Sequence, residues 1–197
     1  MKYYATTYLT KAAIGGSLKE LLNARALNKI SVSEICKNCG ISRKTFYYHF
    51  TDIYDIVSWL FEQEIGVQEE SRSAADGIRY ALQFSQKNRG LCRNLMKDAA
   101  GYEMTRKYLK SIASDAHDTL LHALCESAFS HVPDEFKEFL IDYYSEGFSA
   151  YIIKTINGKE LDVEEIENAV CYLTTMMEIT MPAVLQAMEL RKISGQI

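Results

Sequence analysis

The side chains best suited to do chemistry lie in one short stretch near the amino terminus. This stretch is Ser42-Arg43-Lys44-Thr45-Phe46-Tyr47-Tyr48-His49-Phe50. Phe46 and Phe50 are four residues apart and would share one face of a helix, which leaves hydrogen-bond donors and flat rings on the other faces. Such an outward surface suits the major groove of DNA, where base edges offer acceptors, donors and thymine methyl groups.

The side chains of this helix have separate expected roles. Arg43 and Lys44 lie in the first turn and could donate to guanine, Arg43 in the stronger bidentate manner; the alternative is that both are solvated charges. Tyr48 could pack on a thymine methyl or a sugar, or else on a neighbouring helix. Ser42 and Thr45 supply neutral donors, and a helix end that faces DNA can also present backbone N–H groups to phosphate.

A second short helix and a turn must position this first one. Ser33 is expected to cap the preceding helix and is a further neutral donor toward DNA, while Ile35 and Cys39 give that helix an apolar stripe. Gly40 stands where the chain must turn through a left-handed conformation, which glycine enters without steric cost. Ser42 then caps the outward-facing helix. The two helices and their turn predict a helix-turn-helix.

The spacing resembles the amino-terminal domain of the TetR family of transcriptional regulators. The turn Gly40-Ile41-Ser42 is similar to the family's Gly-Val-Ser, and the helix end Phe46-Tyr47-Tyr48-His49-Phe50 to its Leu-Tyr-x-His-Phe. Phe46 stands where the family usually has leucine, and Lys44 where it often has glycine. The helix end, the early Trp59 and the chain length look most similar to the branch that includes the regulator of dihydroxyacetone kinase genes.

This resemblance implies roles that the residues alone do not give. Tyr47 and His49 match the family's Tyr-x-His pair and would hold backbone phosphates, which fixes register without reading sequence. The family's last two long helices usually form a four-helix dimer interface, here about 134–157 and 163–191. The apolar run in the second of these ranges is compatible with that interface, although burial within one subunit is the alternative; the run comprises Met176, Met177, Met181, Val184, Leu185 and Met188.

The charge distribution favours a nucleic-acid partner. The 197-residue chain carries a net charge of −4, but residues 1–60 hold eight basic and four acidic side chains, a local +4 that leaves −8 for residues 61–197. A basic end on an acidic body is typical of a protein that touches phosphate at one end only. An asymmetry of this size also arises by chance in ordinary proteins, so it supports the motif and does not replace it.

Composition predicts a folded, mainly helical protein of the cytoplasm. Apolar residues make up 48% and there are two prolines. No segment approaches the roughly 20 apolar residues of a membrane helix, and the first residues lack the apolar block of a signal peptide, so no membrane association is expected. The five cysteines suggest no disulfide framework. Cys36 and Cys39 form a Cys-x-x-Cys that has no second ligand pair and lies in a predicted helix, so we interpret them as packing residues.

The predicted fold is all-α. An amino-terminal three-helix domain with the helix-turn-helix would occupy residues 1–52, a linking helix about 53–70, and a helical bundle for effector binding and dimerisation 71–197. Gly15 and Gly16 within the first helix either permit close packing or are tolerated weak points. Pro182 should kink the last helix. The longer helices are expected at about 8–25, 53–69, 74–86, 90–99, 102–130, 134–157 and 163–191.

The carboxy-terminal range holds two further candidate sites. Aromatic residues could line a small-molecule cavity in the bundle, or form ordinary core; those proposed are Tyr102, Tyr108, Tyr144, Phe148 and Tyr151. Asp118, His122 and Cys125 would share one helix face near His117, but one helix supplies too few ligands for a metal site. We expect no metal and no cofactor. No nucleophile–base pair or phosphate-binding glycine loop is present, so no enzymatic activity is predicted.

The sequence therefore predicts a homodimeric DNA-binding transcriptional regulator. Its partners would be a double-stranded DNA operator, a second copy of the chain, and a small-molecule effector or protein co-regulator that modulates operator affinity. Two rivals come from other classes. One is a helical interaction subunit without DNA binding, and the other is a metal-dependent enzyme on a helical bundle.

Overall fold

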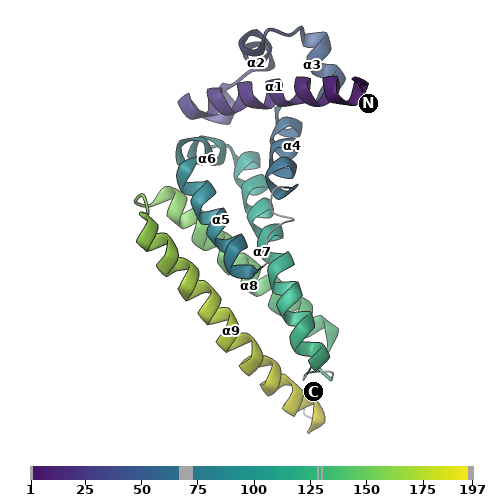
Figure 1. The fold of residues 1–197 in the computed structure, drawn as a ribbon, viewed down its shortest axis with the longest axis vertical. Helices are drawn as coiled ribbons and strands as arrows, with labels where there is room; N and C mark the ends of the chain where they lie inside the picture. Colours follow the sequence, from purple (N-terminus) through teal and green to yellow (C-terminus); the bar gives the residue numbers. More distant parts are fainter. Residues whose placement is uncertain (1, 67–72, 128, 130, 195–197) are drawn as a thin grey trace. The chain divides into compact units, whose positions relative to one another are not determined.

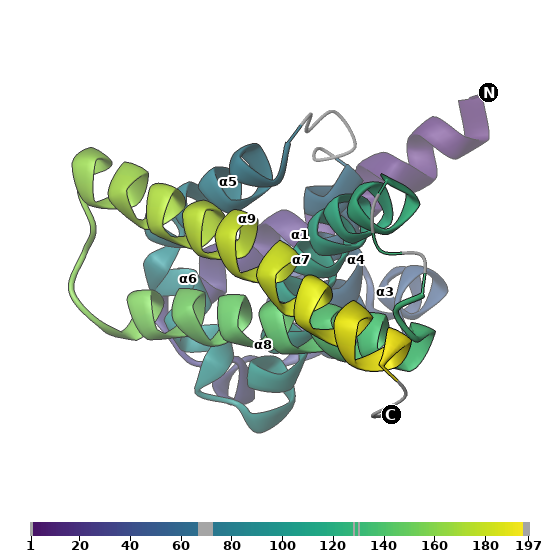
Figure 2. The ribbon, with the colours of Figure 1, turned by 90° about the horizontal axis from the view of Figure 1, so that it is seen from below.

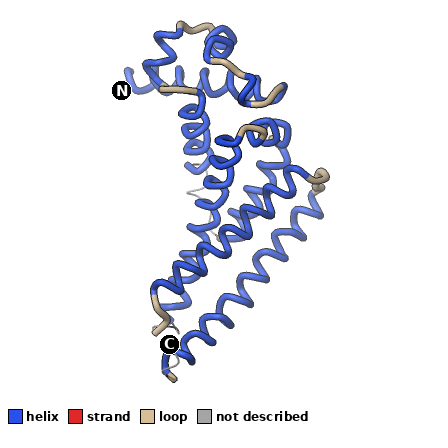
Figure 3. The backbone as a smooth tube through the Cα atoms, turned by 180° about the vertical axis from the view of Figure 1, so that it is seen from behind, coloured by secondary structure: helices blue, strands red, loops and turns tan. Residues whose placement is uncertain are grey.

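The computed structural model describes residues 2–66, 73–127, 129 and 131–194 (Figure 1). Throughout these residues the regular elements are helices, and no strand occurs among them (Figure 3), which confirms the all-α prediction. The elements are α1 (Lys2–Ala24), a 3-10 helix η1 (Leu27–Lys29), α2 (Val32–Cys39), α3 (Arg43–His49), α4 (Ile53–Gly66), α5 (Ala74–Lys87), α6 (Arg89–Met96), α7 (Ala99–Ser127), α8 (Asp134–Asn157) and α9 (Val163–Ile193).

The chain packs as two compact units. The first unit is Met1–Glu69 with Asn88–Thr105, and the second is Glu70–Lys87 with Arg106–Ile197. The first unit therefore contains α1 to α4 and α6, whereas the second contains α5, α8, α9 and most of α7. The functional division expected from the sequence, at 52 and 71, stays a prediction. No helix in the described ranges combines the length and the apolarity needed to cross a bilayer.

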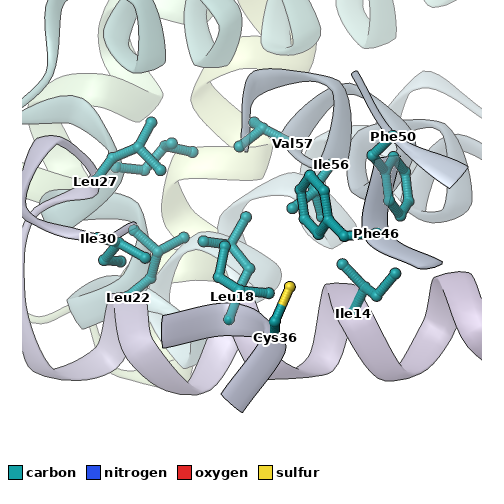
Figure 4. Close-up of a cluster of buried hydrophobic side chains, with 12 residues drawn as sticks. Ile14, Leu18, Leu22, Leu27, Ile30, Cys36, Phe46, Phe50, Ile56 and Val57 are labelled. Atoms are coloured by element: carbon teal, nitrogen blue, oxygen red, sulfur yellow. The ribbon is translucent and has the colours of Figure 1, made fainter. Parts of the chain in front are cut away.

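The core of the first unit forms around α1. Ile14, Leu18 and Leu22 are spaced four residues apart, so they lie on one face of this helix and are almost fully buried. Phe46 of α3 is buried in the same cluster (Figure 4). Ile35 of α2 also belongs to this cluster. Burying one such side chain contributes about 1.5–3 kcal/mol, so this cluster fixes the helix-turn-helix on α1.

Two neighbouring glycines of α1 differ in what surrounds them. A Cβ atom on Gly15 would lie 2.9 Å from Leu60 Cδ2 and 2.9 Å from Trp59 Cζ3, both on α4. A Cβ atom on Gly16 would meet nothing within 4 Å. Gly15 therefore permits the close packing of α1 on α4, whereas Gly16 is a tolerated weak point. Each of the two interpretations offered by the sequence applies to one glycine.

The second unit is a helical bundle. In it α5 packs against α8 and α9 (Figure 2). Arg79 on α5 holds Glu167 on α9 with two parallel hydrogen bonds, Nε to Oε1 at 2.8 Å and Nη2 to Oε2 at 3.0 Å. A buried cluster lies along α7, α8 and α9 and contains Leu121, Val132, Leu140, Met177, Met181 and Leu185. Three residues of the apolar run in α9 are thus buried within the unit itself: Met177, Met181 and Leu185.

Helix boundaries depart from the predictions mainly at the ends. α1 begins at Lys2 and not near Tyr8. α7 begins at Ala99 and not near 102, because Asp98 caps this earlier start: the Gly101 N–H donates to Asp98 Oδ1 at 3.0 Å. α8 has the predicted bounds, and Asp162 caps α9 as expected, accepting from the Glu165 N–H at 2.8 Å. α9 continues through Pro182, so the kink stays a prediction. The predicted end of the linking helix at 69 lies outside the described residues.

Candidate nucleic-acid interface

The first helix of the helix-turn-helix is capped by Ser31, so the expectation that Ser33 caps it is wrong. The Glu34 N–H donates to Ser31 Oγ at 3.3 Å, and the Ser31 N–H donates to Glu34 Oε2 at 2.9 Å. This reciprocal capping box satisfies two orphan donors and starts the helix at Val32. Ser33 lies exposed in the first turn of α2, where it remains a candidate donor toward DNA.

The turn and the start of α3 have the predicted chemistry. Gly40 has φ +70°, in the left-handed region, and the following Ile41 N–H donates to the Cys36 carbonyl at 3.0 Å. Ser42 caps α3, because its Oγ accepts from the Thr45 N–H at 3.0 Å. The hydroxyls of Ser42 and Thr45 also share a hydrogen bond of 2.9 Å.

Polar contacts lock α2 onto α1. The buried Ser17 hydroxyl donates to the Ile35 carbonyl at 3.1 Å, while the Asn38 amide donates to Ser17 Oγ at 3.1 Å and to Glu20 Oε2 at 2.8 Å. Phe46 of α3 is buried in the core cluster of the same unit, so its packing holds α3 as well. The outward face of α3 is consequently presented by a rigid support.

The structure leaves the predicted DNA-binding side chains accessible. Tyr47 and Tyr48 are 52% and 67% exposed. Ser42, Arg43 and Lys44 are exposed, and Thr45 and His49 are half-buried. The Arg43 guanidinium donates a hydrogen bond to the Tyr47 side chain, which raises the pKa of Arg43. The rings of Tyr48 and His49 meet edge to face, 5.0 Å between centroids.

Lys11 on α1 is a cation of this surface that sequence reasoning missed. Its Nζ lies 5.1 Å from the centroid of the Phe50 ring, at the end of α3. Burial lowers the pKa of His49, and the nearby charge of Lys11 lowers it further. No local signal could have paired residues so far apart in sequence. The general excess of basic residues before position 60 was the only indication.

The second unit contains a cavity of about 780 Å³, and three of the five predicted pocket residues line it. These are Tyr144, Phe148 and Tyr151, all on α8. Tyr102 belongs to the first unit and Tyr108 is buried elsewhere on α7; neither is among the lining residues. The wall contributed by α7 is instead His117, more than two turns beyond Tyr108.

The residues considered for a metal or redox site are placed as follows. His122 is exposed and Cys125 is half-buried, while the side chain of Asp118 lies outside the described part of the structure. Among described side chains, no three His, Cys, Asp or Glu gather to hold a metal ion. Burial raises the pKa of both Cys36 and Cys39, which keeps these thiols protonated and unreactive.

Known proteins match both parts of the chain. The family model described as "Bacterial regulatory proteins, tetR family" matches residues 18–58, and the one described as "Transcriptional regulator C-terminal region" matches residues 72–176. A curated relative, the HTH-type dhaKLM operon transcriptional activator DhaS of Lactococcus lactis subsp. lactis (strain IL1403), is 36% identical over 56 residues. That match spans 28% of this chain and only 30% of the relative's length.

A solved structure shows the same fold over most of the chain. It is that of the dihydroxyacetone kinase operon activator DhaS, with a TM-score of 0.67. The match covers 88% of this chain and 96% of that one, at 18% sequence identity. At this identity the likeness shows the fold alone.

Proposed function

Because the chain belongs to the tetR family of bacterial regulatory proteins, we propose that it binds an operator by placing α3 in a major groove. The observation that carries this proposal is the exposed face of α3, whose donors and rings stand on buried Phe46 and Phe50. A helix that is anchored on one side and rich in donors on the other matches the requirement of groove reading. The intact donor set argues against a subunit that has lost DNA binding.

Base reading and phosphate binding divide along α3. Arg43 and Lys44 are the proposed readers of base edges, with Tyr48 against a thymine methyl or a sugar. The remaining side chains hold backbone phosphates and fix the register. Lys11 joins this second group because its ammonium lies at the end of α3 beside His49. The proposed phosphate-binding residues are Lys11, Ser33, Ser42, Thr45, Tyr47 and His49.

We further propose that the protein is a homodimer through α8 and α9. The support is a set of exposed apolar side chains on these two helices, notably Tyr143, Tyr172, Met176 and Ile179. Exposed apolar side chains gathered on one pair of helices mark an interaction surface. Two α3 helices would then meet half-sites roughly 34–36 Å apart on one face of the duplex.

A ligand or protein co-regulator bound to the second unit would bias the spacing of the two DNA-reading heads. Such coupling is typically about 1–3 kcal/mol, so it shifts operator affinity without acting as an absolute lock. The five free cysteines are consistent with action in the reducing cytoplasm. The role is regulatory and not enzymatic, in line with the regulators that the chain resembles.

Salt dependence of DNA binding tests the proposal. The full chain should bind duplex DNA with an affinity that falls steeply as salt rises, because phosphate contacts release counterions. Lys11→Ala should reduce the slope of log affinity against log salt by about 1. The matched control is Lys192→Ala at the end of α9, which should leave the slope unchanged. Absence of duplex binding at low salt would contradict the proposed function.

A further inference from the structure

One ion pair joins the end of α1 to the start of α2. The Nη2 atom of Arg25, the residue that follows α1, lies 2.8 Å from Glu34 Oε1. Both side chains are partly exposed, Arg25 by 39% and Glu34 by 41%. Ion pairs in contact with water contribute little to stability, because water screens the attraction. This pair therefore adds little to folding, and its position indicates another role.

Glu34 carries its negative charge as a member of the capping box. Its Oε2 accepts hydrogen bonds from the Ser31 N–H at 2.9 Å and from the Ser31 hydroxyl at 2.8 Å. These bonds, and after them the contact with Arg25, lower the pKa of Glu34, so its carboxylate is ionised at neutral pH. The other oxygen, Oε1, is the one that faces Arg25. The cap of α2 thus places a negative charge in the first turn of this helix.

That negative charge lies on the helix expected to meet the DNA backbone. When the second helix of a helix-turn-helix enters the major groove, the first helix crosses the backbone. Ser33, the residue before Glu34, is exposed and is one of the proposed phosphate-binding residues. The start of a helix attracts phosphate through its N–H groups, whereas an ionised carboxylate at the same place repels it. Capping by Glu34 therefore opposes DNA binding unless another group cancels its charge.

We propose that Arg25 cancels the charge of Glu34 toward DNA, so that α2 keeps its capping box on the side that meets phosphate. Arg25 is then a positioning residue that acts through Glu34 and does not touch DNA. Its guanidinium stays protonated at every physiological pH, so the cancellation is permanent. At 0.1 M salt a charge acts over about 10 Å, so the nearest phosphates would be repelled by an uncompensated carboxylate. The inference rests on the proposed function, because it concerns the same interface.

Two neutral substitutions and their combination test this in the full chain. Arg25→Gln leaves Glu34 uncompensated and should weaken the binding of duplex DNA by about three- to fivefold at low salt. Glu34→Gln should strengthen binding by a similar factor, and it keeps the capping box because glutamine also serves at this position. The double variant restores the balance of charge, so its affinity should return to within about twofold of the wild type.

The salt dependence separates this role from a structural one. Raising the salt shortens the range of a charge, so the effects of both single variants should shrink. A merely structural role would lower the free energy of unfolding in urea and leave the salt dependence of DNA binding unchanged. Lys137→Gln is the matched control. It also removes one positive charge from an ion pair, with Asp134 on α8, and should leave DNA affinity unchanged.

The double variant distinguishes charge cancellation from direct contact with DNA. If Arg25 itself binds a phosphate, Glu34→Gln cannot restore the loss, so a double variant as weak as Arg25→Gln overturns the inference. Weaker binding by Glu34→Gln alone overturns it too. Duplex binding by the wild type is measured in the same series. Its absence contradicts the proposed function and the inference together, whereas wild-type binding that Arg25→Gln does not weaken refutes the inference alone.

Discussion

The guanidinium of Arg43 donates a hydrogen bond to the side chain of Tyr47, one turn further along α3. The proposed base reader and a proposed phosphate-binding residue are therefore neighbours on one face of α3. The relationship also means that the two residues are best tested as a pair.

Arg43→Ala should relax base preference at one operator position. Removing a bidentate contact to guanine should reduce discrimination there by about tenfold. Tyr47→Phe should instead weaken binding to all sequences by similar factors, because phosphate contacts carry no sequence information. Both variants should be titrated against one operator and its single-base substitutions. Unchanged relative affinities for Arg43→Ala, or a loss at one base only for Tyr47→Phe, would reverse these assignments.

Replacement of the two serines near the start of α2 should have unequal effects. Ser31→Ala removes the capping oxygen and should lower the free energy of unfolding by about 1 kcal/mol. Ser33→Ala is the matched control, since Ser33 is exposed in the first turn and alanine is a good helix former. Urea unfolding of both variants measures the difference. Equal losses would show that Ser31 does not carry the cap.

The neighbouring glycines of α1 provide a second matched pair. Gly16→Ala should stabilise the protein by up to about 1 kcal/mol, because its Cβ would lie in open space and alanine favours the helix. Gly15→Ala should destabilise it, since the new Cβ would lie 2.9 Å from both Trp59 and Leu60. Thermal unfolding of the two variants distinguishes them. A gain in melting temperature for Gly15→Ala would contradict the close packing of α1 on α4.

Burial of His117 predicts a loss of stability in mild acid. The pKa of its ring falls from 6.5 in an exposed histidine to about 4 in the fold, so the unfolded chain binds the extra proton first. Stability from this group is complete above pH 6.5 and is lost as the pH falls toward 4, by at most about 3 kcal/mol. His49, whose pKa is also lowered, adds a slope of the same sign. The measurement is therefore the difference in unfolding free energy between the wild type and His117→Gln across this range. A difference that does not vary with pH would contradict the burial of a neutral imidazole.

Ile179→Glu should convert the proposed dimer to monomers. Ile179 is 65% exposed on α9, so a carboxylate there leaves the subunit folded but places charge in the proposed interface. Ile179→Leu is the control and should remain dimeric. Met177 would be a poor choice for this test, because it is buried in the core of its own unit. Sedimentation velocity gives the result, and an unchanged dimer in Ile179→Glu would exclude this face.

The sequence predicts most of this fold because its signals are local. Gly40 and Ser42 determine the turn and the cap through their own backbone and side-chain chemistry, and Pro133 and Asp162 mark the starts of α8 and α9. The misplaced cap of α2 has a local cause as well. Both Ser31 and Ser33 are suitable capping residues, and only Glu34, three residues after Ser31, distinguishes them.

The residues that sequence reasoning missed depend on contacts between distant elements. Lys11 reaches the end of α3 from α1, and nothing near it in the sequence indicates this contact. His117 is buried against Ser145 of α8, so its place in the cavity depends on how two helices pack. Residue type alone places Tyr102 and Tyr108 in the same pocket, and neither lines it. The α7 residue that lines the cavity is instead His117.

Selection of bound fragments from random duplex DNA tests the central proposal most directly. The wild-type chain should enrich a site with two related half-sites, whose centres lie about one helical turn apart or slightly more on one face. Selection with Arg43→Ala should return the same spacing with one base position relaxed in each half-site. Failure to enrich any sequence over the starting pool, or an identical motif from Arg43→Ala, would contradict the proposal that α3 reads the operator.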